Sequence, residues 1–247
     1  MKRRIRAAWR LARIVVHVLH GVAITLWSFR GMDRAQRQAK VRWWAGKMLR
    51  VSGVAFERHG EPARGGCLLI ANHVSWLDIV AVHAVCPQAR FVSKADVKRW
   101  PVLNRLVDAA GTVYLEREKR RDAMRVVHHI GEALQAGDLV AVFPEGTTGT
   151  GRELLPFHAN LLQAAIATAA PVQPLALRYG DAQAAISDAV VYVGDTSLLE
   201  SLWLVACADG LRVSLRFLEP QASAGEDRRA LGERLRQSIG QALDARR

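Results

Sequence analysis

Acidic residues are almost missing from the first fifth of the chain. Residues 1–50 contain thirteen lysines and arginines but a single carboxylate, Asp33. The rest of the chain holds 22 basic and 22 acidic side chains, so the net charge of +12 comes from the N-terminal segment. A basic segment of this kind is typical of contact with an anionic partner, either a nucleic acid or a membrane surface.

Cysteine is also scarce. The three cysteines, Cys67, Cys86 and Cys207, lie in apolar stretches and lack the spacing of a metal site. An odd number of such thiols favours a reducing compartment over a disulfide framework. Low-complexity segments and internal repeats are absent, and half of the residues are hydrophobic, so we do not expect disorder. The length of 247 residues fits one large α/β domain with a smaller appendage.

The Gly-x-Ser-x-Gly motif of many serine hydrolases is missing as well. In a lipase or thioesterase of that type, this motif forms a sharp turn between a strand and a helix that carries the nucleophilic serine. The sequence therefore argues against this class of enzyme.

A basic stripe runs along the first predicted helix. Its members recur every three or four residues, which places them on one helix face. The stripe consists of Arg3, Arg6, Arg10, Arg13, His17 and His20. The remainder of the helix is mostly apolar and carries Trp9 and Trp27. A basic stripe opposite an apolar face fits an anionic membrane surface better than a nucleic-acid groove.

This first helix is marginal as a membrane span. The stretch between Arg13 and Arg30 has sixteen residues, which is about 24 Å of helix against about 30 Å of hydrocarbon. It also contains two histidines, so we favour immersion in one leaflet over a crossing. A secretory signal is an alternative, but no small-x-small cleavage site stands out after the apolar stretch.

A second helix is expected after Gly31, with Asp33 as its N-cap, continuing to Ser52-Gly53. Together the two helices would form a membrane-docking hairpin over residues 1–53. The alternative is a helix packed on the remaining domain, and both can hold in part.

Residues 54–247 alternate short β-rich runs with helical patterns. The predicted strands are 67–71, 90–93, 112–115, 139–143, 172–178, 190–193 and 211–217. The predicted helices are 75–85, 99–109, 121–135, 159–169, 197–207 and 227–245. This alternation predicts an α/β fold with a mixed, mostly parallel sheet flanked by helices. Ligands bind such sheets at the carboxyl ends of the strands.

The most informative polar cluster is the segment 72–78, directly after the first of these strands. His73 and Asp78 are five residues apart, which is about 500° on a continuous helix and would place them on different faces. They can meet only if His73 sits in a turn and the helix begins near Ser75. Such a pair could deprotonate an alcohol while the carboxylate orients the imidazole. Alternatively, Ser75-x-x-Asp78 is a helix capping box and His73 an ordinary loop histidine.

Two further loops carry polar residues after predicted strands. Phe143-Pro144-Glu145-Gly146-Thr147 combines a carboxylate and a hydroxyl with glycine, which allows close backbone approach. The segment 111–117 ends in Glu116-Arg117, where the guanidinium could grip a phosphate. By itself, Arg117 is better explained by a surface ion pair within 116–122.

Together these segments resemble the glycerolipid acyltransferases, which move a fatty acyl group onto glycerol-phosphate and lysophospholipids. Four blocks occur in the order found in that family. They are Asn72-His73 with Asp78 (a His-x4-Asp signature), Gly111 to Arg117, Phe143 to Thr147, and Val172-Gln173-Pro174. Phe91-Val92-Ser93-Lys94 with Trp100-Pro101 also looks like a family segment, and the similarity covers roughly residues 65–180.

The resemblance implies a role for each matching residue. His73 would be the general base, and Asp78 would orient it. Arg117, with Lys94 as a second candidate, would hold the phosphate of the acceptor. Further substrate-binding residues are expected in the same blocks: Asn72, Glu145, Gly146 and Thr147.

The implied reaction is acylation of the free hydroxyl of 1-acyl-sn-glycerol-3-phosphate, giving phosphatidic acid. Acyl-CoA or acyl-carrier protein would be the co-substrate, with no metal or other cofactor and no nucleic acid. Backbone N–H groups near the His73 turn or the Gly146 loop would stabilise the oxyanion. The enzyme would work on the cytoplasmic face of the inner (plasma) membrane, as a peripheral or single-span protein.

The chain departs from the family pattern at two places. Thr148-Gly149 stands where Arg-Ser is common, and Phe157-His158 where Phe-Lys is frequent. Both changes remove positive charge near the acceptor, although Arg152 follows closely. Because enzymes that acylate lyso-ornithine lipid look similar in this loop, that lysolipid is the alternative acceptor.

Overall fold

The computed structural model describes residues 2–94, 103–115 and 120–245. Within them, seven strands form one sheet in the order β1-β7-β6-β2-β5-β3-β4. All neighbouring strands are parallel except β6 and β7, which are antiparallel. The strands are β1 (Ala55–His59), β2 (Cys67–Ala71), β3 (Arg90–Lys94), β4 (Val113–Leu115), β5 (Leu139–Val142), β6 (Val172–Gly180) and β7 (Arg212–Phe217). The predicted mixed, mostly parallel sheet is confirmed.

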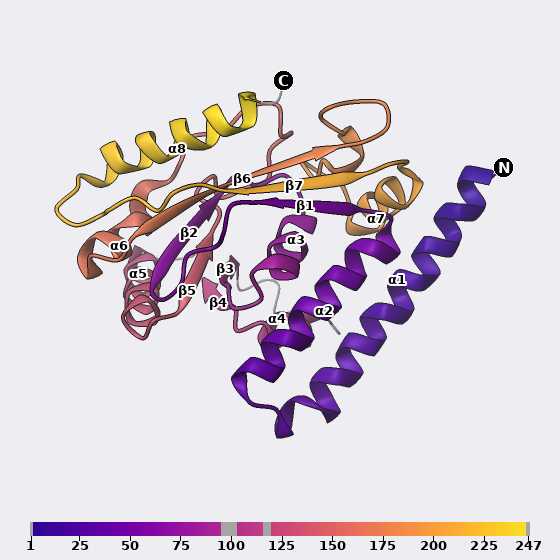
Figure 1. Ribbon diagram of the computed structural model, residues 1–247, viewed down its shortest axis with the longest axis horizontal. Helices are drawn as coiled ribbons and strands as arrows, with labels where there is room; N and C mark the ends of the chain where they lie inside the picture. The colour runs from indigo at the N-terminus through magenta and orange to yellow at the C-terminus, as the bar shows by residue number, and fades with distance from the viewer. Residues whose placement is uncertain (1, 95–102, 116–119, 246–247) are drawn as a thin grey trace.

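Helices cover both faces of the sheet (Figure 1). One face packs against α5 (Arg120–Gln135), α6 (Leu162–Thr168) and α8 (Arg228–Asp244). The other packs against α2 (Arg34–Ser52), α3 (Leu77–Val85) and α7 (Leu198–Cys207). The long helix α1 (Lys2–Trp27) lies outside these, and α4 (Leu103–Ala109) stands near α1. Short 3-10 turns occur at Phe29–Gly31, Ala159–Leu161 and Asp188–Val190.

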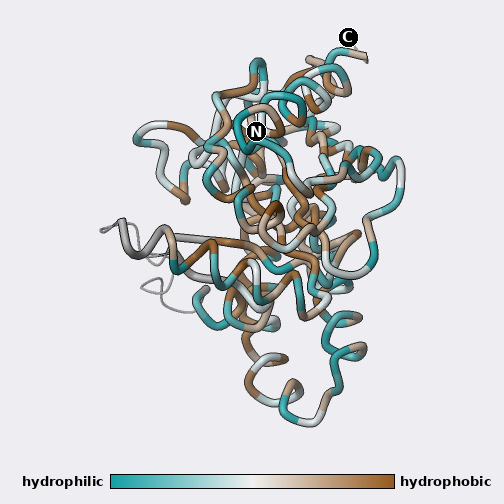
Figure 2. Tube along the Cα trace, turned by 90° about the vertical axis from the view of Figure 1, so that its left-hand side faces the viewer, coloured by the Kyte–Doolittle hydropathy of each residue, from teal (hydrophilic) through white to brown (hydrophobic). Residues whose placement is uncertain are grey.

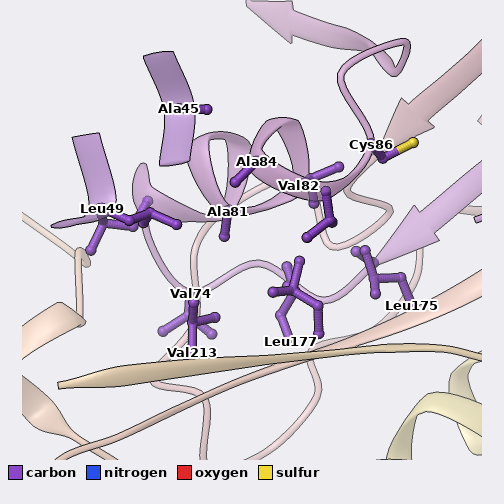
Figure 3. Packing of buried hydrophobic residues seen from close by; sticks show 14 of the residues in the cluster. Ala45, Leu49, Val74, Ala81, Val82, Ala84, Cys86, Leu175, Leu177 and Val213 are labelled. Atoms are coloured by element: carbon purple, nitrogen blue, oxygen red, sulfur yellow. The ribbon is translucent and has the colours of Figure 1, made fainter. Parts of the chain in front are cut away.

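The central strand β2 explains the layered arrangement. All five of its residues are buried and apolar, as expected for a parallel strand covered on both faces. Figure 3 shows the layer on the α3 side, where Leu49 of α2 and Ala81 of α3 pack above Leu177 and Val213 of the sheet. The second helix of the N-terminal hairpin therefore shares the core of the α/β body.

Two sequence expectations need correction. Residues 190–193 do not form a strand, because a 3-10 turn capped by the Ser187 hydroxyl occupies Asp188–Val190, and residues 191–193 join no described strand. Strand β1 was not predicted, since this edge strand is largely exposed and has no apolar–polar alternation. The other predicted strands match observed ones to within two residues at each end.

The N-terminal hairpin has well-defined internal contacts. Asp33 caps α2 in a reciprocal capping box with Gln36, as the sequence predicts for the cap residue. The His17 ring stacks on Trp44, and each residue's ring nitrogen contacts the carbonyl oxygen of the other, at 2.9 and 3.1 Å. Gly21 permits this approach, because a Cβ there would lie 2.2 Å from Trp44 Nε1.

Three arginines of the basic stripe of α1 bond to α7 and the residues that follow it. Arg3 donates to the carbonyl oxygen of Cys207, and Arg10 donates to those of Ala206 and Ala208. Arg6 pairs with Asp209 at 3.1 Å. These arginines satisfy the carbonyl end of α7, where a helix favours positive charge. These three arginines are therefore engaged within the protein, whereas Arg13 and His20 of the same stripe are exposed.

The outward face of α1 is apolar instead. Trp9, Val16 and Trp27 are 64%, 66% and 79% exposed. By length and composition, Arg3–Trp27 is the one described helix that could cross a membrane. In Figures 1 and 2 the closed end of the α1–α2 hairpin projects beyond the α/β body.

Candidate active site

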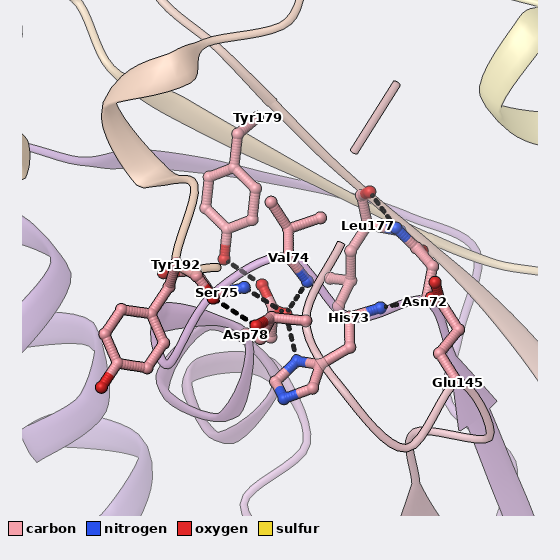
Figure 4. A network of polar contacts seen from close by, with 10 residues as sticks. Asn72, His73, Val74, Ser75, Asp78, Glu145, Leu177, Tyr179 and Tyr192 are labelled. Atoms are coloured by element: carbon pink, nitrogen blue, oxygen red, sulfur yellow. Dashed lines mark hydrogen bonds and ion pairs between the residues drawn. The ribbon is translucent and has the colours of Figure 1, made fainter. Parts of the chain in front are cut away.

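His73 and Asp78 are directly bonded (Figure 4). The helix α3 begins at Leu77, so His73 lies in the preceding turn and Asp78 in the first helical turn. This is the arrangement that the five-residue spacing requires for the two side chains to meet. The distance from His73 Nδ1 to Asp78 Oδ2 is 2.7 Å.

The Asp78 carboxylate is completely buried and accepts four hydrogen bonds. Its Oδ2 accepts from His73 Nδ1 and from the main-chain N–H groups of Val74 and Ser75, at 2.7 and 2.9 Å. Its Oδ1 accepts from the Tyr179 hydroxyl at 2.7 Å. Burial and the neighbouring carboxylate raise the pKa of Tyr179 well above its ordinary value, so this phenol stays protonated as a donor.

This network determines the tautomer of His73. A carboxylate only accepts hydrogen bonds, so Nδ1 carries the proton and Nε2 keeps its lone pair. No hydrogen bond to Nε2 occurs within the described part of the chain. The arrangement leaves one basic nitrogen available to an incoming hydroxyl.

The capping-box alternative is only half realised. Asp78 does accept from the Ser75 N–H group, but the Ser75 hydroxyl is buried and has no partner among the described residues. Asp78 therefore orders the turn and orients His73 with the same carboxylate.

Aromatic stacking fixes the plane of the imidazole. The Phe143 ring lies parallel to His73, with a centroid distance of 3.9 Å and an interplanar angle of 6°. Phe91 packs on the far side of Phe143 at 5.5 Å. The His73 side chain remains 18% exposed, so it is held tightly without being closed off.

Glu145 and Asn72 brace the turn that carries His73. Glu145 accepts from the main-chain N–H groups of His73 and Leu155, at 2.8 and 3.0 Å, and burial raises its pKa. Asn72 exchanges two hydrogen bonds with the main chain of Leu177 on β6. Their polar side-chain atoms thus bond to the protein's own backbone, whereas the sequence assigns them to substrate.

The Gly146 loop closes over the same turn. Gly146 has a φ of +69°, a conformation that favours glycine, and the Gly149 N–H donates to the His73 carbonyl oxygen at 2.7 Å. The Thr148 hydroxyl donates to the carbonyl oxygen of Tyr192. Thr147 is exposed on the loop and faces the cavity described next.

A large cavity begins at His73. Its volume is about 890 Å³, and it runs between the N-terminal hairpin, α3 and α4. This volume falls within the roughly 300–1,000 Å³ of small-molecule sites. His73, Phe143 and residues 146–148 contribute to its lining, and most of the other lining residues are apolar. A ligand in this cavity can reach His73 with a long apolar chain enclosed by helices.

The side chains predicted to bind phosphate, those of Lys94 and Arg117, fall outside the described part of the chain. Lys94 ends β3 beside Leu115 of β4, but its side chain, the whole of Arg117, and the Trp100-Pro101 pair lie outside the described residues. Arg152 forms an ion pair with Asp188 at 2.8 Å. Among the described residues, no cluster of three or more His, Cys, Asp or Glu side chains forms a metal site.

Sequence reasoning missed Tyr179 and the stacking role of Phe143. Tyr179 follows the last predicted residue of its strand and is 101 residues from Asp78. Its only sequence signal is a tyrosine at the carboxyl end of an apolar strand, where ligand-binding residues gather.

The family follows from comparison with known proteins. A profile of the family described as Acyltransferase matches residues 54–178, about half of the chain. This chain belongs to the acyltransferase family. The matched region contains His73, Asp78 and the Gly146 loop.

Curated relatives of this acyltransferase carry two kinds of name. A 1-acyl-sn-glycerol-3-phosphate acyltransferase of Neisseria gonorrhoeae is 36% identical over 87% of this chain and 89% of its own length. A lyso-ornithine lipid O-acyltransferase of Pseudomonas aeruginosa is 34% identical over 97% of this chain and 94% of its own length. The fold also matches the crystal structure of the 1-acyl-sn-glycerophosphate acyltransferase of Thermotoga maritima, with a TM-score of 0.73 and 18% identity, covering 99% and 97% of the two chains.

Proposed function

We propose that this acyltransferase moves a fatty acyl group from acyl-CoA or acyl-carrier protein to the free hydroxyl of 1-acyl-sn-glycerol-3-phosphate. The product is phosphatidic acid. One observation carries the proposal: His73 lines an apolar cavity of about 890 Å³, with Nδ1 bonded to Asp78 and Nε2 free to accept a proton.

The reaction needs no covalent enzyme intermediate. The acceptor hydroxyl gives its proton to His73 Nε2 while its oxygen attacks the thioester carbonyl carbon. A positioned general base such as His73 contributes about 100-fold to 10,000-fold in rate. Asp78 supports it by stabilising the imidazolium that forms. The tetrahedral intermediate then breaks its C–S bond, and the leaving thiolate takes the proton back from Nε2.

The geometry narrows the choice of oxyanion donor. The N–H groups of His73, Val74 and Ser75 already donate to carboxylates, and those of Gly146 and Gly149 donate to carbonyl oxygens. These amides, on which the sequence expectation centred, are therefore engaged within the protein. Thr147 lines the cavity, and no hydrogen bond of its N–H group occurs in the described part of the chain. We assign the oxyanion contact to Thr147.

Glu145 and Asn72 act through the backbone in this proposal. Each holds the turn between β2 and α3 against a neighbouring loop or strand, which fixes where His73 lies. Arg117 and Lys94 keep their predicted role as ligands of the acceptor phosphate, and donor binding needs no cofactor. The enzyme would act at the cytoplasmic face of the inner membrane.

A lyso-ornithine lipid acceptor is the second candidate. The loop that lines the cavity is neutral at Thr147 and Thr148, and Arg152 is paired with Asp188. Both features suit an acceptor without phosphate, and one relative with that name aligns over 97% of this chain.

The two acceptors are separated by a direct assay. Purified enzyme is given labelled acyl-CoA with either 1-acyl-glycerol-3-phosphate or lyso-ornithine lipid, and the lipid products are resolved. We expect faster turnover of the phosphate acceptor, and we expect Arg117→Ala to raise its KM at least tenfold. Turnover of lyso-ornithine lipid alone, unaffected by Arg117→Ala, would establish the second candidate. Hydrolysis of acyl-CoA without any acylated product would exclude both.

A further inference from the structure

One wall of the cavity is a single face of α3. Residues spaced three or four apart lie on the same side of a helix, and four residues of the cavity lining follow this spacing: Trp76, Ile79, Val80 and His83. The wall starts close to His73 and ends at His83, in the last turn of α3. A chain that leaves the reaction site along this wall therefore passes His83.

His83 is a buried polar group on this wall. The residue is 6% exposed, its Nδ1 is fully buried without a partner, and no hydrogen bond of Nε2 occurs in the described part of the chain. Burial lowers the pKa of His83 to about 4, so the ring is neutral at pH 7. A neutral imidazole has one N–H donor and one acceptor nitrogen, and neither is used within the described residues.

Threonine hydroxyls elsewhere in the cavity wall are already used. Those of Thr25, Thr112 and Thr148 donate to main-chain carbonyl oxygens. Four described residues have a fully buried side-chain nitrogen or oxygen without a partner: Arg6, His17, Ser75 and His83. Of these four, His83 alone lines the cavity. Its unused hydrogen-bonding capacity is therefore directed at whatever occupies the cavity.

Stacked rings hold His83 at a fixed place relative to His73. His83 packs edge-on against Phe91, with the ring centroids 5.2 Å apart. Phe91 stacks on Phe143, and Phe143 stacks on His73. The separation of His83 from the reacting centre is therefore set by packed side chains.

We propose that His83 binds a hydroxyl group part-way along a fatty acyl chain, so that the enzyme selects hydroxylated chains over plain ones. The inference rests on the proposed function and names the class of acyl chain that it uses. A polar group in an apolar wall is destabilising without a partner, and a plain hydrocarbon chain offers none. A hydroxyl group both donates and accepts, so it matches either tautomer of the neutral ring. Nε2 makes the contact, because Nδ1 is closed off.

The helix sets where on the chain the hydroxyl group must lie. Leu77 and His83 are six residues apart, which is about 9 Å along a helix axis. An extended chain advances about 3.5 Å for every three bonds, so about eight bonds of an acyl chain span this distance. The reacting carbonyl lies at His73, before Leu77, which places the hydroxyl group at about the tenth carbon. A hydroxyl group next to the thioester lies too close to His73 to reach His83.

Two chains can bring this hydroxyl group into the cavity. One is the acyl group of the thioester donor, and the other is the chain already present on the lysolipid. The experiment therefore places the hydroxyl group on each chain in turn.

The donor arm compares 10-hydroxystearoyl-CoA, 2-hydroxystearoyl-CoA and stearoyl-CoA with the acceptor that the enzyme turns over. The wild-type kcat/KM should favour the 10-hydroxy chain over the other two by about tenfold, the ratio that one net hydrogen bond supplies. The acceptor arm gives stearoyl-CoA to lysolipids that carry either a 10-hydroxystearoyl or a stearoyl chain. A preference in that arm alone assigns His83 to the acceptor chain. Equal rates in both arms would overturn the proposal and leave His83 to an ordered water molecule.

Variants test whether His83 is the origin of the preference. His83→Phe should abolish it, whereas His83→Asn should keep part of it, because an amide also donates and accepts. Ile79→Leu is the matched control on the same wall, since it keeps the volume and changes no polar group, so the preference should stay at its wild-type value. Urea midpoints identify the variants that fold. A wild-type preference in folded His83→Phe would refute the assignment.

Direct binding separates this proposal from the proposed function. 10-Hydroxystearic acid and stearic acid are each used to displace a fluorescent fatty acid from the full-length protein. Tighter binding of the hydroxy acid that is lost in His83→Phe, in a protein without acyltransferase activity, would refute the proposed function alone. Acyl transfer to a lysolipid with no preference for a hydroxylated chain would refute the role of His83 alone.

Discussion

The charge of Asp78 can be removed while most of its hydrogen bonds are kept, which makes Asp78→Asn the most informative variant of the site. Three donors converge on Oδ2, so the asparagine oxygen should occupy that position and keep the bonds to His73, Val74 and Ser75. The new amide then replaces Oδ1 and faces Tyr179, whose hydroxyl can turn to accept from it. The imidazole keeps its tautomer and orientation, and only the negative charge is lost.

The expected effects on stability and on rate differ strongly. Weaker bonds to a neutral acceptor should cost about 1–3 kcal/mol of unfolding free energy. Turnover should fall about 100-fold to 10,000-fold, because the imidazolium formed in the transition state is no longer stabilised. Asp78→Ala is a poor substitute: it leaves four buried donors unpaired at about 1–3 kcal/mol each, a total comparable to the roughly 5–15 kcal/mol that keeps a domain folded.

The assay compares kcat for 1-acyl-glycerol-3-phosphate at saturating acyl-CoA with the urea midpoint of the same preparation. A variant with an intact midpoint and a 100-fold lower kcat is the expected result. Wild-type turnover by a folded Asp78→Asn protein would refute the reasoning that the carboxylate charge assists His73.

Three further predictions concern the hairpin, the buried histidine of α3 and the buried thiols. Gly21→Ala should destabilise the protein by about 1–3 kcal/mol, because the new methyl group overlaps Trp44. Gly46→Ala has no atom near the new Cβ and should stabilise the protein by up to about 1 kcal/mol. Equal urea midpoints for the two variants would contradict the close packing of α1 on α2. Burial lowers the pKa of His83 to about 4. Below about pH 6.5 the unfolded chain therefore binds a proton at this histidine that the folded protein excludes. The free energy of unfolding should fall by roughly 3 kcal/mol as the pH drops from 6.5 to 4. His83→Phe should lose that part of the pH dependence, and an unchanged profile in urea melts would show that His83 is not buried as a neutral group. Burial raises the pKa of Cys67 to about 11 and that of Cys86 to about 12. Neither thiol should therefore react with a maleimide at pH 7 until urea unfolds the chain. Rapid labelling of either cysteine in the native protein, located by mass spectrometry, would contradict their burial.

Sequence reasoning succeeded where the signal is local. The buried run of β2 and the positions of most helices follow from apolar periodicity, and the placement of His73 in a turn follows from the angle that five residues subtend on a helix. Asp33 was found as an N-cap because capping depends on residues three positions apart.

The errors occur where distant segments meet. The contacts of Arg3 and Arg10 depend on the carbonyl end of α7, about 200 residues away, which no spacing within α1 reveals. Strand β1 is ordered by pairing with β7, although its own residues are exposed and show no strand pattern. Tyr179 reaches Asp78 only because β6 lies beside β2 in the sheet. In each case tertiary contacts outweigh local preference.

The roles of Glu145 and Asn72 illustrate a different limit. Polar residues in loops that follow strands invite assignment to substrate, but these two side chains bond to main-chain groups that surround His73. A sequence shows which residues carry suitable chemistry, and only coordinates show whether that chemistry is already used within the protein.

The most direct test of the account is the turnover of purified His73→Ala with 1-acyl-glycerol-3-phosphate and acyl-CoA. The imidazole is 18% exposed, and the Glu145 bond uses the main-chain N–H of residue 73, so the variant should fold. We predict a free energy of unfolding, from urea melts, within about 2 kcal/mol of the wild-type value. We also predict at least a 100-fold loss of kcat. A folded His73→Ala protein that transfers the acyl group at the wild-type rate would contradict the claim that this imidazole is the base.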